Sequence, residues 1–84
     1  MSASPFFHQA SQEVRFYVQV SGGSVGASIG KATLHYRFCP ESRTDDPLQT
    51  FAAHRSEIES AVRRRITAGS LQPVMLREYD LPRP

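Results

Sequence analysis

One stretch of the sequence, Pro47 to about Ala68, carries the signals for both ends of a long amphipathic helix. Asp46 is a typical N-cap, and proline at the first helical position costs no hydrogen bond. Arginines in the last turns oppose the helix dipole, and Gly69 is a natural left-handed terminator. At ~1.5 Å per residue such a helix is roughly 33 Å long, which is enough to cross a small sheet completely.

The apolar face of this predicted helix contains an arginine. Its apolar residues recur every three or four positions; they are Leu48, Phe51, Ala52, Ile58, Val62 and Ile66. Arg55 stands on this face where an aliphatic residue is expected. Burying an unpaired guanidinium is costly, so we expect an ion pair, for example with Glu59, or a buried stem whose charged head reaches an edge. The functional alternative is anion binding by Arg55 in a groove. We interpret His54 as a surface or rim residue.

Two alternating segments before the helix predict a β-hairpin. Apolar and polar residues alternate over Glu13 to Val20 and again over Val25 to Ile29. The Ser-Gly-Gly-Ser sequence at 21–24 supplies the turn between them. The outward side of the first strand carries Arg15, Tyr17 and Gln19, which suit solvent or a modest partner surface.

The remaining segments are assigned less uniquely. Gly30 to Phe38 fits a strand by its alternation and a helix by its i,i+4 pairs, with Ser28 as a cap. Pro73 to Tyr79 reads as a final strand, followed by a tail marked by Pro82 and Pro84. Residues 1–12 read as a loosely held arm in which Phe6 and Phe7 touch the body.

Length and composition bound the class of protein. The 84 residues allow one small domain with a folded body at 13–81, whose thin core would gain from self-association. The formal charge of +2 is too small to imply nucleic acid or anionic lipid. With Cys39 as the single cysteine, no signal peptide and no apolar run long enough for a membrane span, we expect a cytoplasmic protein that is not membrane-bound.

Short patterns along the chain resemble a small proteobacterial family known only as domain of unknown function 1488. The matching residues are Val14-Arg15-Phe16, Ala27-Ser28-Ile29, Leu34, Phe51, His54-Arg55, Ile58-Glu59, Ala61, Pro73-Val74 and Leu76. The resemblance implies two strands, a short helix at Gly30 to Phe38, the long helix and a returning strand. Lys31 and Thr33 depart from the acidic residues that the family pattern places in the short helix. The resemblance implies no activity, substrate or cofactor.

Two further groups of residues invite chemical interpretations. Three consecutive arginines, 63–65, suggest nucleic-acid binding, but successive helix positions lie about 100° apart and dipole complementation explains them without a ligand. His35, Cys39 and His54 are the soft metal ligands nearest one another in sequence. They match no usual zinc signature, so we expect no metal and no other cofactor.

The sequence contains no phosphate-binding loop, nucleophile elbow or recognisable carboxylate pair, so we expect no enzyme and assign no catalytic residues. We predict an α+β fold: a small antiparallel sheet, made of the hairpin and the C-terminal strand, with one short and one long helix on one face. The predicted core is Val14, Phe16, Val18, Ile29, Leu34, Phe38, Leu48, Phe51, Ile58, Val62, Ile66 and Val74. The candidate binding or structural residues are Arg15, Tyr17, His54, Arg55 and Glu59.

The expected function is a non-catalytic protein-interaction module that acts through an edge strand or a homodimer face. The alternative is a nucleic-acid-associated accessory or regulatory protein.

Overall fold

The predicted hairpin forms the centre of the sheet. In the computed structural model, which describes residues 4–81, β2 (Glu13–Val20) pairs antiparallel with β3 (Gly23–Gly30). Val20 lies opposite Gly23, so Ser21 and Gly22 alone connect the strands. Gly23 has a φ of 131°, a conformation that glycine adopts without a steric penalty.

Two short strands complete the sheet, in the order β1-β2-β3-β4. β1 (Phe6–His8) pairs antiparallel with β2, which corrects the prediction that residues 1–12 form a loosely held arm. β4 (Val74–Leu76) pairs with β3, but the pairing is parallel. The predicted final strand therefore ends early, and a turn of 3-10 helix, η1 (Glu78–Asp80), follows it. Residues 1–3 of the predicted arm, and the tail marked by Pro82 and Pro84, lie outside the described residues.

The ambiguous segment after the hairpin is helical, as the family resemblance implied. α1 (Lys31–Phe38) begins directly after β3, with Gly30 in an extended conformation as its N-cap. The N-cap position is occupied by Gly30, and no side chain caps α1. The predicted Ser28 cap is therefore wrong. Ser28 instead lies within β3 opposite Arg15.

The predicted long helix is broken at His54. α2 (Pro47–Ala53) ends there and α3 (Arg55–Thr67) begins on its other side, so the described residues contain three α-helices instead of one short and one long helix. α2 packs against α1, β1 and β2, whereas α3 packs against β2 and β4. The His54 ring stacks on Phe38, with 4.0 Å between ring centroids and 12° between the planes. The break lets α2 and α3 pack on different parts of the twisted sheet. One straight helix could not follow the twist over the same length.

Both predicted ends of the long helix are confirmed. The Asp46 carboxylate accepts a hydrogen bond of 2.9 Å from the Leu48 backbone N–H at the start of α2. α3 ends at Thr67, and Gly69 has a φ of 95° just beyond it.

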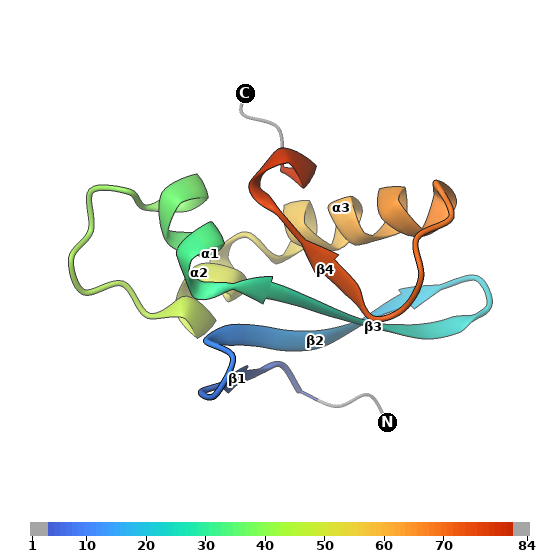
Figure 1. The fold of residues 1–84 in the computed structure, drawn as a ribbon, viewed down its shortest axis with the longest axis horizontal. Helices are drawn as coiled ribbons and strands as arrows, with labels where there is room; N and C mark the ends of the chain where they lie inside the picture. Colours follow the sequence, from blue (N-terminus) through green and yellow to red (C-terminus); the bar gives the residue numbers. More distant parts are fainter. Residues whose placement is uncertain (1–3, 82–84) are drawn as a thin grey trace.

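All three helices pack on one face of the sheet, which confirms the α+β class (Figure 1). The Phe16 and Phe51 rings meet there, 4.6 Å between centroids. The buried core consists of Val14, Phe16, Val18, Val25, Ala27, Ile29, Leu34, Phe51, Ile58, Ala61, Val62, Val74, Leu76 and Leu81. Three predicted core residues, Phe38, Leu48 and Ile66, are only partly buried at its margin. Among residues 4–81, no helix has both the length and the apolar character needed to cross a membrane.

Candidate functional site

The sheet face opposite the helices is open and carries large apolar side chains. Phe6, Tyr17 and Met75 remain 47%, 47% and 49% exposed, although each lies on a strand. Register places them together: Phe6 lies opposite Arg15 on β2, and Met75 lies opposite Ser28 on β3. Because opposed residues point to the same face, one row of side chains crosses all four strands of the sheet.

This row borders a shallow groove of about 410 Å³, which we call the open-face groove. Its lining consists of Phe6, Glu13, Arg15, Phe16, Tyr17, Gly26, Ala27, Ser28, Pro73 and Met75. Gly26 lies opposite Tyr17, and a Cβ there would come within 3.8 Å of the Tyr17 ring and 3.9 Å of Pro73. Because Gly26 has no side chain, the groove stays open between Tyr17 and Pro73.

Charge in the open-face groove is largely neutralised by an internal ion pair. The Arg15 Nε donates to the Glu13 carboxylate at 2.8 Å. Burial alone would raise the pKa of Glu13, but hydrogen bonds from Arg15, Ser11 and Ser28 outweigh it and lower that pKa below its usual range. The groove therefore offers an apolar surface with one compensated arginine between Phe6 and Ser28.

The other predicted site residues lie on the opposite side of the sheet, at the helix break. Arg55 is not on the buried face of α3: its side chain is 49% exposed, and its Nε donates to Glu59 at 2.9 Å. Its guanidinium also lies over the Phe51 ring, 5.8 Å from the centroid. Glu59 receives Arg63 on its other oxygen at 3.7 Å. The expected ion pair with Glu59 is thus present, but Arg55 does not lie on a buried apolar face, because a new helix begins at Arg55 after the break.

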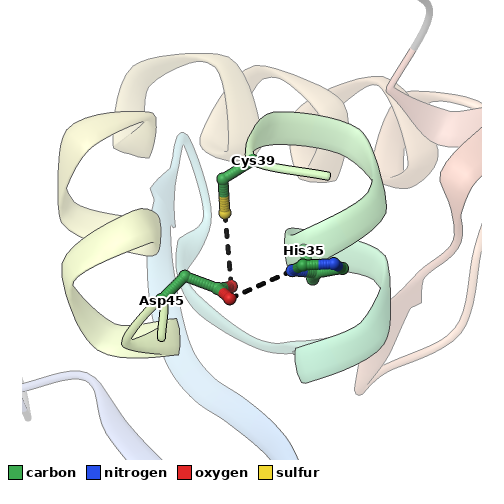
Figure 2. A group of neighbouring side chains, drawn as sticks. All are labelled: His35, Cys39 and Asp45. Carbon is green, nitrogen blue, oxygen red and sulfur yellow. Dashed lines mark hydrogen bonds and ion pairs between the residues drawn. The ribbon is translucent and has the colours of Figure 1, made fainter. Parts of the chain in front are cut away.

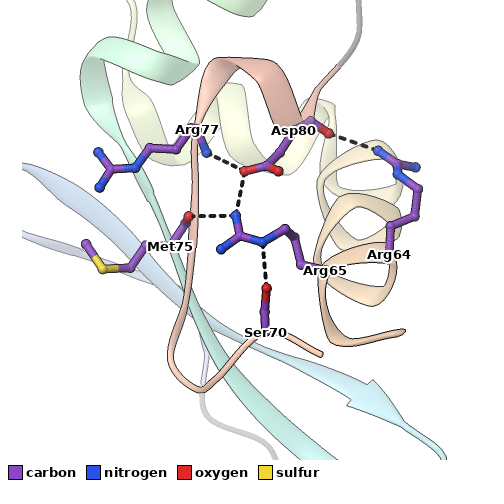
Figure 3. Close-up of polar contacts among 6 residues, drawn as sticks. All are labelled: Arg64, Arg65, Ser70, Met75, Arg77 and Asp80. Carbon is purple, nitrogen blue, oxygen red and sulfur yellow. Dashed lines mark hydrogen bonds and ion pairs between the residues drawn. The ribbon is translucent and has the colours of Figure 1, made fainter. Parts of the chain in front are cut away.

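The three consecutive arginines at the end of α3 hold other segments of the chain. The Arg65 guanidinium bonds Ser70, the Met75 carbonyl and the Asp80 carboxylate, the last at 2.7 Å (Figure 3). Arg64 donates to the Asp80 carbonyl at 2.9 Å, and Arg63 donates to a backbone carbonyl at the end of β2. The side chains do fan around the helix, and their donors are directed toward the protein itself.

A second polar cluster joins the end of α1 to the connector that precedes α2. The Asp45 carboxylate lies between His35 Nδ1, at 3.0 Å, and the Cys39 thiol, which donates to it at 3.2 Å (Figure 2). Burial raises the pKa of Cys39, and the Asp45 carboxylate raises it further, while a contact with Thr50 partly offsets both effects. The pKa of Asp45 is lowered, chiefly by the bond from Cys39. His35 bonds the carboxylate instead of the sulfur, so these residues do not form an activated thiol pair.

The open-face groove and the cluster of His35, Cys39 and Asp45 were each partly predictable from the sequence. Arg15 and Tyr17 were selected from strand alternation, but Met75 joins them only through the parallel pairing of β4. Of the three soft ligands nearest in sequence, His35 and Cys39 lie together at the end of α1, and His54 is not part of their group. Asp45 belongs to this group and was not among the predicted soft ligands. The short connector between α1 and α2 brings the chain back to the end of α1. This connector is the sequence signal that could have placed Asp45 beside His35 and Cys39.

Comparison with known proteins places the chain in a family without giving it a function. A solved structure, the crystal structure of a protein of unknown function from the DUF1488 family of Shewanella loihica PV-4, is similar with a TM-score of 0.66 and 18% sequence identity. The similarity covers 88% of this chain and 86% of that one, and at this identity it shows the fold alone. No match to a curated protein was found. The family model described as "Protein of unknown function (DUF1488)" matches residues 2–76, so the chain belongs to the DUF1488 family.

Proposed function

We propose that the protein is a non-catalytic, cytoplasmic protein-interaction module that binds a partner protein through the open-face groove. The observation that carries the proposal is that Phe6, Tyr17 and Met75, each about half exposed, line this groove on one face of the sheet. Contact between water and a group of apolar side chains is unfavourable. Covering these side chains with a partner therefore lowers the free energy.

The chemistry of the groove suits a protein surface. Tyrosine, phenylalanine, methionine and arginine are the residue types enriched in protein interfaces, and Phe6, Tyr17, Met75 and Arg15 supply one of each. Arg15 and Glu13 lie among these residues but pair with each other, so a partner that covers the groove meets no unpaired charge from them. The partner surface we propose is therefore a mainly apolar segment.

A second copy of the chain is one form such a partner can take. β1 is an edge strand of the sheet beside the groove, and its unpaired backbone groups can pair with an added strand. The small core would also gain stability from association. A homodimer through β1 and the groove is thus a specific version of the proposal.

Nucleic acid is the second candidate, favoured by one observation. Phe6 and Tyr17 are exposed aromatic rings beside an arginine on an open sheet, an arrangement on which unpaired bases can stack. Against it, Glu13 compensates Arg15, and Arg64 and Arg65 donate to other parts of the chain. The protein-interaction proposal therefore rests on the stronger set of contacts.

Capture of partners from native lysate tests the proposal. We expect proteins retained by the wild type to be lost with Tyr17→Ser and with Met75→Ser, and to be retained after nuclease treatment. Tyr36→Ser is the matched control, because Tyr36 is 56% exposed on α1 and lies outside the groove. Thermal unfolding of each variant verifies that it folds.

The outcomes separate the candidates. Equal capture by the groove variants and the wild type contradicts the proposal, and loss after nuclease treatment favours the nucleic-acid alternative. Sedimentation over a range of protein concentrations addresses the homodimer: a strict monomer excludes that version.

A further inference from the structure

We propose that His35, Cys39 and Asp45 form a binding site for one divalent cation of the zinc class. This inference is independent of the open-face groove, which lies on the other face of the sheet. The imidazole Nδ1, the sulfur and a carboxylate oxygen all lie within 4.8 Å of one another. The three side chains come from two segments and point toward a common centre (Figure 2).

The ligand atoms lie near enough to one another to be compared with a tetrahedral site. Metal–ligand lengths of about 2.0–2.3 Å at tetrahedral angles separate neighbouring ligand atoms by roughly 3.3–3.6 Å. His35 Nδ1 lies 3.0 Å from one Asp45 oxygen, Cys39 Sγ lies 3.2 Å from the other, and one ligand atom from each of the three residues lies within 4.8 Å of the other two. Side-chain rotations that bring one Asp45 oxygen, His35 Nδ1 and Cys39 Sγ to these tetrahedral separations would admit an ion.

Local structure holds the ligands in place. Cys39 is the C-cap of α1, and its backbone N–H donates to the His35 carbonyl at 2.9 Å, which holds the two residues one turn apart. Asp45 lies beside the start of α2, which Asp46 caps. The Thr50 hydroxyl lies 3.7 Å from the Cys39 sulfur and can orient it as an outer partner.

The donor set indicates the kind of ion. A thiolate, an imidazole and a carboxylate together suit zinc and its substitutes, whereas calcium and magnesium prefer oxygen ligands alone. The side chains of His35 and Asp45 are 25% and 13% exposed, so water can enter and supply the fourth ligand. A depression of about 260 Å³ borders Cys39 and Asp45 and gives the ion a path from solvent.

Metal titration of the untagged, full-length protein tests the site. After treatment with a chelator, we expect the wild type to bind one Zn²⁺ with a Kd below about 10 µM and to unfold at a higher temperature when Zn²⁺ is present. Co²⁺ should give a sulfur-to-metal charge-transfer band, which arises only when a thiolate is a ligand.

Variants locate the ion. Cys39→Ser should remove the charge-transfer band and weaken Zn²⁺ binding at least ~100-fold, and His35→Gln and Asp45→Asn should weaken it at least ~10-fold. His8→Gln is the control, since His8 lies on β1 and bonds Ser11. Unfolding of each variant in chelator verifies its fold. No charge-transfer band with the wild type, or Zn²⁺ binding unchanged by Cys39→Ser, overturns the proposal.

Discussion

The arginines of α3 form two kinds of ion pair, one within the helix and one with a distant segment of the chain. Arg55 and Glu59 are four residues apart on a helix, so their pairing was predictable from spacing and is confirmed. Arg65 pairs with Asp80 in a segment that returns to α3 only after β4 has formed. No local pattern specifies such a partner, and consecutive arginines at a helix end therefore looked like dipole complementation alone.

Glu13 gives a pH prediction at the residue scale. Its pKa is lowered in the folded protein, so its carboxylate stabilises the fold above the unfolded pKa of about 4.3, and this contribution is lost as the pH falls through the folded value. We expect Glu13→Gln to reduce the free energy of unfolding at pH 7 and to have a smaller effect at pH 3. Urea unfolding at both pH values measures the difference.

The pKa of Asp45 is also lowered, so Asp45 too makes the fold less stable in acid. Because the wild type and Glu13→Gln both contain Asp45, this effect cancels when their free energies of unfolding are subtracted. An effect of Glu13→Gln that is the same at pH 3 and pH 7 would contradict the assignment to the charged carboxylate.

Secondary-structure elements were predictable where local pattern and tertiary packing agree. The alternation of β2 and β3 and the cap at Asp46 are local signals, and all are confirmed. The break at His54 coincides with tertiary contacts: its ring stacks on Phe38, and α2 and α3 both contact β2 but otherwise contact β1 and β4 respectively. The open-face groove was likewise predictable on β2 alone, since neither β1 nor the parallel register of β4 has a signature in its three residues.

The Asp46 cap gives a prediction at the element scale. Its carboxylate satisfies the Leu48 N–H, and α2 is only seven residues long, so the cap supports a large share of the helix. We expect Asp46→Ala to lower the free energy of unfolding by about 1 kcal/mol. Urea unfolding at pH 7 measures it. Glu41→Ala, an exposed acid in the same connector, is the control, and an equal loss in both would show that the cap is not the cause.

At the scale of the whole molecule, the segment after β4 is fastened to the helical layer. Leu81 is 1% exposed in the core, and its carbonyl accepts a bond of 2.8 Å from Arg37 on α1. Asp80 binds Arg65 through its side chain and Arg64 through its carbonyl, so η1 closes over α3 (Figure 3). The helix layer is thus completed by residues from the far end of the described chain.

Asp80 carries the prediction at this scale. Its carboxylate is mostly buried and accepts bonds from Arg65 and from the Arg77 backbone N–H. We expect Asp80→Ala to lower the free energy of unfolding by about 2 kcal/mol, with faster amide hydrogen exchange at residues 77–81. Glu78→Ala, an exposed acid in the same turn, serves as the control and should change the stability little. Unchanged exchange at 77–81 in Asp80→Ala would show that the segment is held by other contacts.

The parallel pairing of β3 with β4 also bears on the speed of folding. The hairpin joins neighbours along the chain, whereas Val74 reaches Ala27 only after all three helices have been traversed. Closing that long loop costs more chain entropy, so arrival of the C-terminal strand is expected to set the folding rate. Until β4 pairs, one edge of β3 has unpaired backbone groups. Newly synthesised chains at high concentration are then most prone to aggregate by pairing these edges.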